Sequence, residues 1–347
     1  MPLPPIAKII CTLGPSTDSL AVLRRMARAG MAVARLNFSH GSHASHAARL
    51  RLIARLNEHP DFFVRVLQDL EGHRIRIDAL DAPRLLAKGQ VVRLGRLKAS
   101  RDAIPLDYDG TFVSVRRGGR IFIDDGKIML TVLETGADVI RARVVVGGEL
   151  KQRKGVNIPG FRFPRLGLTT KDEADLVFGI RNRVDFVAQS FVRNASDVRD
   201  LKARIDSARP RIRIIAKIES TEGIRNIDEI LPLVDGVMIA RGDMGVSIPI
   251  YRVPMVQKAI IRKCNRMKKF AVTATQMLES MTENPWPTRA EVSDVANAYL
   301  DGSDYLMLSG ETAVGKHPVA TIRMMRQTLD FTRKSVVQLG IANRENA

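Results

Sequence analysis

Lys217 and Glu219 are the residues whose types and spacing first suggest chemistry. They lie in the otherwise apolar run 214–219, and side chains two residues apart on a strand point to the same face. A buried charge needs a partner, because desolvating it unpaired costs several kcal/mol. One interpretation is an internal Lys–Glu ion pair. The other is a cation placed over a transferring group, with a carboxylate beside it that binds a metal.

Asp243 is a second carboxylate, and it follows the next apolar run in the segment Ala-Arg-Gly-Asp-Met-Gly of residues 240–245. Two carboxylates from neighbouring strand ends form a hard-oxygen site suited to Mg²⁺, which keeps waters and takes other ligands from substrate oxygens. Gly242 and Gly245 let the backbone approach a ligand closely. Alone, this segment is more often a turn, so the Mg²⁺ prediction depends on Glu219.

Arg35, Asn37 and Ser39 alternate along another apolar run and so share one face. A guanidinium, an amide and a hydroxyl together suit a phosphate or a carboxylate. A lone histidine such as His40 is usually structural or solvated. The other histidines of this region are interpreted as surface residues: His43, His46 and His59. Without a histidine pair at metal-ligand spacing, a zinc site is not expected.

Eight short apolar runs predict strands, and helical segments alternate with them. The predicted strands cover residues 6–13, 32–38, 62–70, 184–191, 212–219, 236–240, 270–275 and 304–308. Most are continuously apolar, as strands buried on both faces of a parallel sheet should be. Polar residues gather where these strands end: Arg35, Asn37, Ser39, His40, Asp69, Ser190, Lys217, Glu219, Arg241, Asp243, Thr275, Ser309 and Glu311.

Between residues 76 and 164 the alternation gives way to short strands and glycine-rich turns. Removing 78–162 leaves about 260 residues, the size of a (β/α)₈ barrel. We therefore predict an α/β TIM barrel formed by residues 1–77 and 163–347. A small all-β lid domain, residues 78–162, is inserted after barrel strand 3 and would hang over the C-terminal mouth of the barrel.

Three helix starts have a capping pattern. Thr170 with Glu173, and Thr288 with Glu291, have the spacing of capping boxes. Ser196 is predicted to cap the helix that follows it.

The composition indicates a globular protein that attracts anions. Of its 347 residues, 45% are hydrophobic, and 55 Lys and Arg against 37 Asp and Glu give a net charge of +18. Such a field favours anionic partners. Nucleic acid is not expected, because aromatic residues make up only 5% and the arginines are spread along the chain.

No apolar run reaches the ~18 residues that a membrane span needs. The first residues lack the pattern of a secretory signal, and the two cysteines, Cys11 and Cys264, cannot form a disulfide framework or a cysteine zinc site. We therefore expect a cytoplasmic protein without a membrane partner.

Several stretches in order along the chain resemble the pyruvate kinase family. They are residues 8–16, 33–41 (VARLNFSHG), 147–160, 216–219 (AKIE), 240–246 (ARGDMGV), 274–281 (ATQMLESM), 287–297 and 308–313 (LSGETA). The resemblance covers roughly residues 6–330. It implies a barrel with a β lid after the third strand. It also implies transfer of the phosphoryl group of phosphoenolpyruvate to ADP, giving pyruvate and ATP.

The resemblance also implies roles for residues at the barrel mouth. Glu219 and Asp243 match the Mg²⁺ ligands, and Lys217 matches the cation that stabilises the phosphoryl group in flight and the developing enolate. Thr275 resembles the residue at the protonation face of the enolate, acting through water. Backbone amides around Gly242 and Asp243 would hold the substrate carboxylate.

Other positions match the family's phosphate and nucleotide contacts. Arg35 and Arg76 resemble the grip on the phosphoryl group and the nucleotide phosphates. His40 and Lys171 fall at positions associated with the nucleotide side.

The segment 69–76 departs from the K⁺-requiring members, which read D-T-K-G-P-E-I-R. In those members an Asp, an Asn and a Ser bind the ion, at the positions of Asp69, Asn37 and Ser39 here. This chain reads D-L-E-G-H-R-I-R, closer to the K⁺-independent D-L-Q-G-P-K-I-R. Arg74 would supply a tethered charge in place of the ion, and one charge at ~4 Å is worth roughly 4 kcal/mol at an effective dielectric of ~20. We expect no K⁺ requirement.

Two further departures concern the lid hinge and the end of the chain. His73 stands where the family has a hinge proline, so the resemblance does not give the lid's rest position. Typical members continue into a further C-terminal domain, whereas this sequence ends at Ala347. We therefore expect a short form without sugar-phosphate activation through that domain, and a homodimer would have to form through barrel surfaces.

Two other functions stay open. A metal-dependent keto-acid lyase or aldolase on the same barrel would also place a Glu and an Asp at neighbouring strand ends to bind Mg²⁺ and pyruvate. It would need neither a lid nor a phosphate clamp. A degenerate, non-catalytic homologue that binds anions would fit the +18 charge and His73. The retained Lys217, Glu219, Asp243 and Thr275 argue against it.

Overall fold

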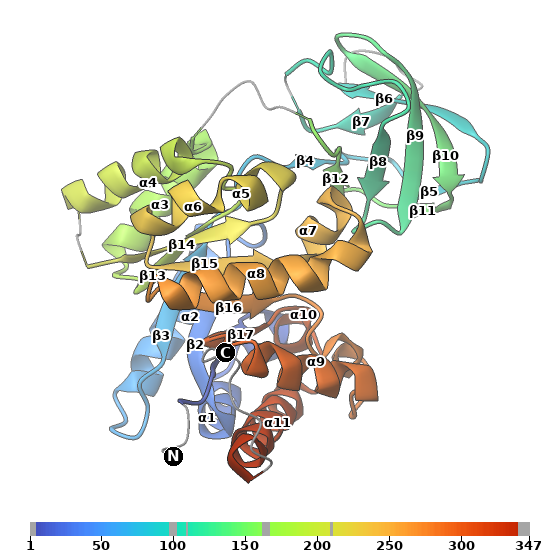
Figure 1. Cartoon of the computed structure of the whole chain (residues 1–347). Helices are drawn as coiled ribbons and strands as arrows, with labels where there is room; N and C mark the ends of the chain where they lie inside the picture. The colour runs from blue at the N-terminus through green and yellow to red at the C-terminus, as the bar shows by residue number, and fades with distance from the viewer. Residues whose placement is uncertain (1–4, 97–102, 109, 162–166, 209–210, 339–347) are drawn as a thin grey trace.

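Eight parallel strands close into a barrel in a computed structural model that describes residues 5–96, 103–108, 110–161, 167–208 and 211–338 (Figure 1). Neighbours around the barrel follow the order β1-β17-β16-β15-β14-β13-β3-β2. The strands are β1 (Lys8–Thr12), β2 (Met31–Asn37), β3 (Arg65–Asp69), β13 (Phe186–Gln189), β14 (Arg213–Ile218), β15 (Gly236–Ala240), β16 (Phe270–Ala274) and β17 (Tyr305–Leu308). All eight predicted strands and the TIM-barrel fold class are confirmed.

Helices connect the strands and cover the outside of the barrel (Figure 1). The α-helices are α1 (Leu20–Ala29), α2 (His43–Asn57), α3 (Thr170–Arg181), α4 (Ala195–Ala208), α5 (Thr221–Arg225), α6 (Ile227–Ile230), α7 (Arg241–Ser247), α8 (Val253–Arg266), α9 (Arg289–Leu300), α10 (Gly310–Ala313) and α11 (Pro318–Gln338). Short 3₁₀ helices are η1 (Pro15–Thr17), η2 (Leu231–Leu233), η3 (Ile250–Arg252) and η4 (Glu279–Thr282). None of the described helices is long and apolar enough to cross a membrane.

A second sheet lies in the stretch predicted as an insert. Seven strands follow the order β4-β12-β8-β9-β10-β6-β7, and β11 pairs with β5 beside them. They are β4 (Ile75–Arg76), β5 (Arg84–Leu86), β6 (Val91–Arg96), β7 (Ile104–Leu106), β8 (Arg120–Ile123), β9 (Ile128–Thr135), β10 (Val139–Val146), β11 (Gly148–Leu150) and β12 (Gly155–Asn157). The sheet has its own apolar core. Its division from the barrel at residues 78 and 162 stays a prediction, and Arg162 lies outside the described residues.

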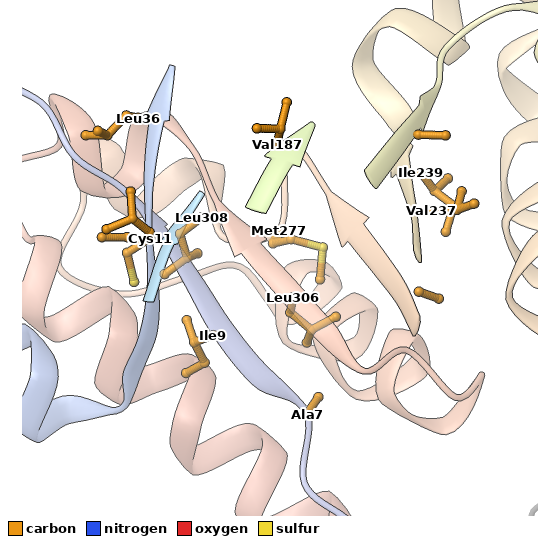
Figure 2. Packing of buried hydrophobic residues seen from close by; sticks show 14 of the residues in the cluster. Ala7, Ile9, Cys11, Leu36, Val187, Val237, Ile239, Met277, Leu306 and Leu308 are labelled. Atoms are coloured by element: carbon orange, nitrogen blue, oxygen red, sulfur yellow. The ribbon is translucent and has the colours of Figure 1, made fainter. Parts of the chain in front are cut away.

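Barrel strands are buried on both faces, as their apolar runs predicted. Along β1, Ile9 and Cys11 belong to the outer cluster, which packs against the helices, while Ile10 belongs to the inner one. Figure 2 shows the outer cluster, with Ile9, Cys11, Leu306 and Leu308 near one another. The barrel interior is therefore filled by side chains, and reactive groups are confined to its ends.

Aspartates fix the strand register at the N-terminal end of the barrel. Asp185, Asp235 and Asp304 each directly precede a strand, and each carboxylate accepts a hydrogen bond from a backbone amide of the neighbouring strand. The donors are the amides of Val66, Ile214 and Ala271, at 2.7, 2.8 and 2.8 Å. A one-residue slip would break these bonds and would turn the strand's side chains to the wrong face.

One of the two predicted capping boxes is confirmed, and the other begins one residue earlier. Thr288 and Glu291 form the expected box at α9. At α3 the capping residue is Thr169 with Asp172, so the prediction of Thr170 with Glu173 was wrong. Thr169 with Asp172 and Thr170 with Glu173 have the same spacing. The Asp172 carboxylate also accepts the Gly72 amide at 3.1 Å, which favours the cap at Thr169.

The predicted cap at Ser196 was also wrong. Helix α4 already begins at Ala195, and the side-chain oxygen of Asn194 accepts the amides of Ser196 and Asp197 at 2.9 and 3.1 Å. Asparagine is as good a capping residue as serine. The Asn194 oxygen accepts two backbone amides, so Asn194 and not Ser196 caps the helix.

Candidate active site

The Lys217 ammonium lies at the centre of the C-terminal mouth of the barrel. Its Nζ is 3.0 Å from Asp69 Oδ1 and 3.2 Å from Glu219 Oε1, and it donates to Ser190 Oγ at 2.6 Å. Burial alone would lower the pKa of Lys217, but the negative charges of Asp69 and Glu219 outweigh burial and hold that pKa above its usual value. The structure therefore keeps this cation charged at the mouth.

Asp69 is the carboxylate that two cations share. Arg35 Nε donates to Asp69 Oδ2 at 2.7 Å, on the side opposite Lys217, and Arg35 Nη1 donates to Thr12 Oγ1 at 2.9 Å. Burial of Asp69 would raise its pKa, but Lys217 and Arg35 together lower it below its usual value. An ionised, buried Asp69 thus holds both cations in place.

Glu219 and Asp243 are the two carboxylates of the predicted hard-oxygen site. Glu219 Oε2 accepts the Phe191 amide at 2.6 Å. Burial of Glu219, opposed by Lys217 and aided by the charge of Asp243, raises its pKa. Two carboxylates that repel each other in this way suit a divalent cation.

The two carboxylates supply the kind of oxygen ligand that Mg²⁺ prefers. Within the described residues, no group of three or more His, Cys, Asp or Glu side chains could hold a metal. A Mg²⁺ ion at the mouth would take Glu219 and Asp243 as its protein ligands. Its remaining positions would go to water and substrate oxygens, as Mg²⁺ prefers.

Arg74 pairs with Asp243 rather than with Asp69. Its Nη2 lies 3.3 Å from Asp243 Oδ1 and 3.6 Å from Asp125 Oδ1, in the turn between β8 and β9. Burial would lower the pKa of Arg74, but Asp243 and Asp125 raise it. Arg74 thus links the second sheet to the barrel mouth, whereas the ion pairs of Asp69 go to Arg35 and Lys217.

The other residues of the predicted monovalent-cation region lie together. Asn37 is aligned with Asp69 across β2 and β3, and its side-chain oxygen accepts the Ser39 amide at 3.1 Å.

His73 Nε2 donates to the Gly167 carbonyl at 3.0 Å, so it joins the two segments that connect the barrel with the second sheet.

Thr275 stands in a strained turn that Arg241 holds. Its φ is 72°, a left-handed conformation that is rare for a β-branched residue and that marks sites where surrounding structure enforces strain. The Arg241 guanidinium donates to the carbonyls of Ala274 and Thr275 at 3.3 and 2.6 Å. Thr275 Oγ1 in turn accepts the Gly242 amide at 2.9 Å, so these two predicted site residues are in contact.

Lys171 and Arg76 meet at one carboxylate. Glu71 Oε1 is 2.8 Å from Arg76 Nη2, and its Oε2 is 3.4 Å from Lys171 Nζ. Glu71 therefore joins two of the predicted nucleotide-side residues, Arg76 and Lys171. Partial burial and then the charge of Arg76 lower the pKa of His40.

The interpretation of His46 as a surface residue was wrong. Only 2% of His46 is exposed, and its ring stacks on Phe38 at 4.1 Å between centroids. His46 Nε2 also donates to the His40 carbonyl at 2.9 Å. Its position on the inner face of α2 explains the burial. His59 is exposed as predicted.

A cleft of about 780 Å³ opens between the barrel mouth and the second sheet. The barrel contributes Ser190 and Asp243 to its lining, and the second sheet and its connections contribute Arg74, Val156 and Ile158. A substrate in this cleft would touch both parts of the chain.

Three site residues were missed from the sequence: Glu71, Asp125 and Asp175. Asp175 follows Lys171 by four residues on α3, a spacing at which helical ion pairs form, so this signal was available. Glu71 lies in the loop after β3 and Asp125 in the turn between β8 and β9, and only the folded chain brings them to Arg76 and Arg74.

Comparison with known proteins decides the family. A family model described as "Pyruvate kinase, barrel domain" matches residues 5–322. The chain belongs to the pyruvate kinase family. It is 47% identical over 326 residues to a pyruvate kinase of Sporosarcina psychrophila, and 46% identical over 326 residues to one of Geobacillus stearothermophilus. These alignments cover 92% of this chain but 55% and 56% of the relatives, so the chain spans about half their length.

We expect Asp69→Asn to destabilise this pyruvate kinase family member strongly. The substitution leaves Arg35 and Lys217 buried without their shared charge, which should lower the free energy of unfolding by about 3 kcal/mol. Urea denaturation followed by circular dichroism measures this change. Asp228→Asn removes an exposed partner of Lys263 and should change the free energy of unfolding by well under about 1 kcal/mol. Equal effects of the two substitutions would contradict the shared-carboxylate interpretation.

Proposed function

We propose that the chain catalyses the Mg²⁺-dependent transfer of the phosphoryl group of phosphoenolpyruvate to ADP, giving pyruvate and ATP. The observation that carries this proposal is the charged Lys217, held by Asp69 beside the carboxylates of Glu219 and Asp243. Family membership and the name of the relatives support it.

Lys217 and Arg35 supply the positive charge that phosphoryl transfer needs. The bond between the bridging oxygen and phosphorus breaks while a bond to a terminal oxygen of ADP forms, and negative charge spreads over the phosphoryl oxygens and the enolate. Asp69 fixes both cations before the substrate arrives, so little reorganisation is required at the moment of reaction.

Glu219 and Asp243 would hold Mg²⁺, which would offset the negative charge of the phosphoryl and carboxylate oxygens. The Phe191 amide orients Glu219 for this role. Backbone amides around Gly242 and Asp243 are proposed to hold the substrate carboxylate, as the family resemblance implies.

Thr275 is proposed to act at the face of the enolate that takes up a proton. Its hydroxyl donates to the Ala274 carbonyl at 2.6 Å and accepts the Gly242 amide. Because the hydroxyl proton is engaged there, we assign Thr275 the orientation of a water that delivers the proton to the methylene carbon.

Arg76, Lys171 and His40 are proposed to contact the nucleotide, with Arg76 and Lys171 on its phosphates. The second sheet is proposed to act as a lid domain, residues 78–162, because it lines the cleft opposite Ser190 and Asp243. The buried, unbridged thiols of Cys11 and Cys264 suit the reducing cytoplasm, where we propose that the enzyme works.

We expect wild-type protein to form pyruvate from phosphoenolpyruvate and ADP with Mg²⁺, and Lys217→Met to form none, because the mutant lacks the central cation. A coupled assay with lactate dehydrogenase measures the product. Folded wild type that binds Mg²⁺ without turnover would favour the keto-acid lyase or aldolase. Strongly salt-dependent anion binding without turnover would favour the degenerate homologue.

We also propose that the reaction does not require K⁺, because Arg74 already places a positive charge at the mouth. Activity in Na⁺ buffer should equal activity in K⁺ buffer. Arg74→Glu, which restores the residue of K⁺-requiring members, should leave activity only in K⁺. Wild-type activity confined to K⁺ would keep the kinase assignment and overturn the role given to Arg74.

A homodimer through the barrel surface is proposed on the exposed apolar side chains of η3 and α8. Ile250, Tyr251 and Met255 are 75%, 80% and 66% exposed, and such neighbouring apolar residues commonly mark a contact surface. Sedimentation equilibrium should give a dimer that Tyr251→Glu dissociates. A monomeric wild type would contradict this proposal.

A further inference from the structure

Asp175 is a buried carboxylate on α3 with both oxygens engaged. Its side chain is only 5% exposed. Oδ1 accepts from His43 Nε2 at 2.6 Å, and Oδ2 accepts from Lys171 Nζ at 2.6 Å. Its backbone carbonyl also accepts Gln68 Nε2 at 2.6 Å, which ties this part of α3 to β3. The carboxylate therefore stands at a fixed place where α2, α3 and β3 meet.

Lys171 is anchored on its inner side and open on its outer side. Besides Asp175, its Nζ donates to the Phe38 carbonyl at 2.6 Å, while half of the side chain (51%) remains exposed. The distance from Nζ to Glu71 is longer, at 3.4 Å. Asp175 and the Phe38 carbonyl therefore set the position of this ammonium, and Glu71 is a secondary partner.

Glu71 also forms an ion pair with Arg76, whose Nη2 lies 2.8 Å from Glu71 Oε1. If Asp175 lost its charge, the nearest remaining carboxylate for Lys171 would be Glu71. Lys171 would then move toward Glu71 and compete with Arg76 for it. Asp175 thereby keeps Lys171 and Arg76 apart, as two separately placed cations.

His43 fixes the rotation of the Asp175 carboxylate. Its ring stacks on Phe178, with 4.6 Å between centroids and an interplanar angle of 25°, and its Nε2 holds Oδ1. With Oδ1 held, Oδ2 is directed at Lys171. His43 is thus a support for Asp175, one step farther from the substrate.

We propose that Asp175 is a positioning residue for the nucleoside diphosphate: it places Lys171 for the phosphates of that substrate and leaves Glu71 to Arg76. This inference rests on the proposed function, which puts Lys171 and Arg76 on the nucleotide phosphates. Asp175 touches no residue of the Lys217–Asp69–Glu219 cluster through any described contact. Its influence should therefore fall on the nucleotide and not on phosphoenolpyruvate.

The test compares Asp175→Asn with Asp301→Asn in steady-state kinetics. Asp301 is a matched control: its side chain is 11% exposed and pairs with Lys258, but it precedes β17, at the opposite end of the barrel. Asp175→Asn should raise KM for ADP about tenfold, the size expected when one charge-assisted contact is misplaced. kcat and KM for phosphoenolpyruvate should stay within about twofold. Asp301→Asn should leave both KM values unchanged.

Asp175→Glu keeps the charge and should recover part of the lost affinity for ADP, which a purely structural role would not require. If Asp175→Asn does not fold, KM for ADP is measured for His43→Gln instead. His43→Gln weakens only the contact to Asp175 Oδ1 and should raise KM for ADP about threefold. An unchanged KM for ADP, or an equal rise in KM for both substrates, would overturn the inference.

Failure of the proposed function would look different. In that case wild-type protein would give no pyruvate at all. Calorimetric titration with ADP would then still report on Asp175, because weaker binding of ADP to Asp175→Asn than to Asp301→Asn needs no turnover. Equal ADP affinities of the two variants would overturn the positioning role by itself.

Discussion

The charge of Asp69 is the constraint on which the barrel mouth depends. Arg35 and Lys217 both pair with this one buried carboxylate, and loss of its charge would leave Arg35 without this ion pair and Lys217 with Glu219 alone. Because Lys217 is shared with Asp69, it only partly neutralises Glu219. Burial raises the pKa of Glu219, and the charge of Asp243 adds to that effect. These two carboxylates are where we propose that the mouth binds a divalent cation.

The rest of the barrel serves to hold these few atoms in position. Aspartates at the N-terminal ends of β13, β15 and β17 fix the strand register, and the register in turn decides which side chains reach the mouth. At the mouth itself the backbone is strained at Phe191 and Thr275, with φ of 54° and 72°. The Glu219 carboxylate accepts the Phe191 amide, and the Arg241 guanidinium donates to the Thr275 carbonyl. Each strained residue is therefore held by a charged side chain of the mouth.

The sequence was sufficient to predict the barrel and the common direction of Lys217 and Glu219 at its mouth. Lys217 and Glu219 lie on a strand with a fixed period of two, so their shared direction follows from local geometry. Contacts made through turns could not be predicted in this way. Arg74 was expected to replace the ion that Asp69, Asn37 and Ser39 would bind, yet its ion pairs go to Asp243 and to Asp125 of the second sheet. The misplaced cap at Thr170 has the same origin, because a distant amide, that of Gly72, decides between two equal patterns.

Binding of Mn²⁺, as a spectroscopic substitute for Mg²⁺, tests the arrangement at the mouth most directly. Electron paramagnetic resonance titration reports free Mn²⁺ and needs neither substrate nor turnover. We expect wild type to bind Mn²⁺, Asp228→Asn to bind it equally well, and Glu219→Gln to bind it at least tenfold more weakly, the loss of roughly 1.4 kcal/mol. Undiminished Mn²⁺ affinity in Glu219→Gln would show that the Glu219 carboxylate does not form the metal site.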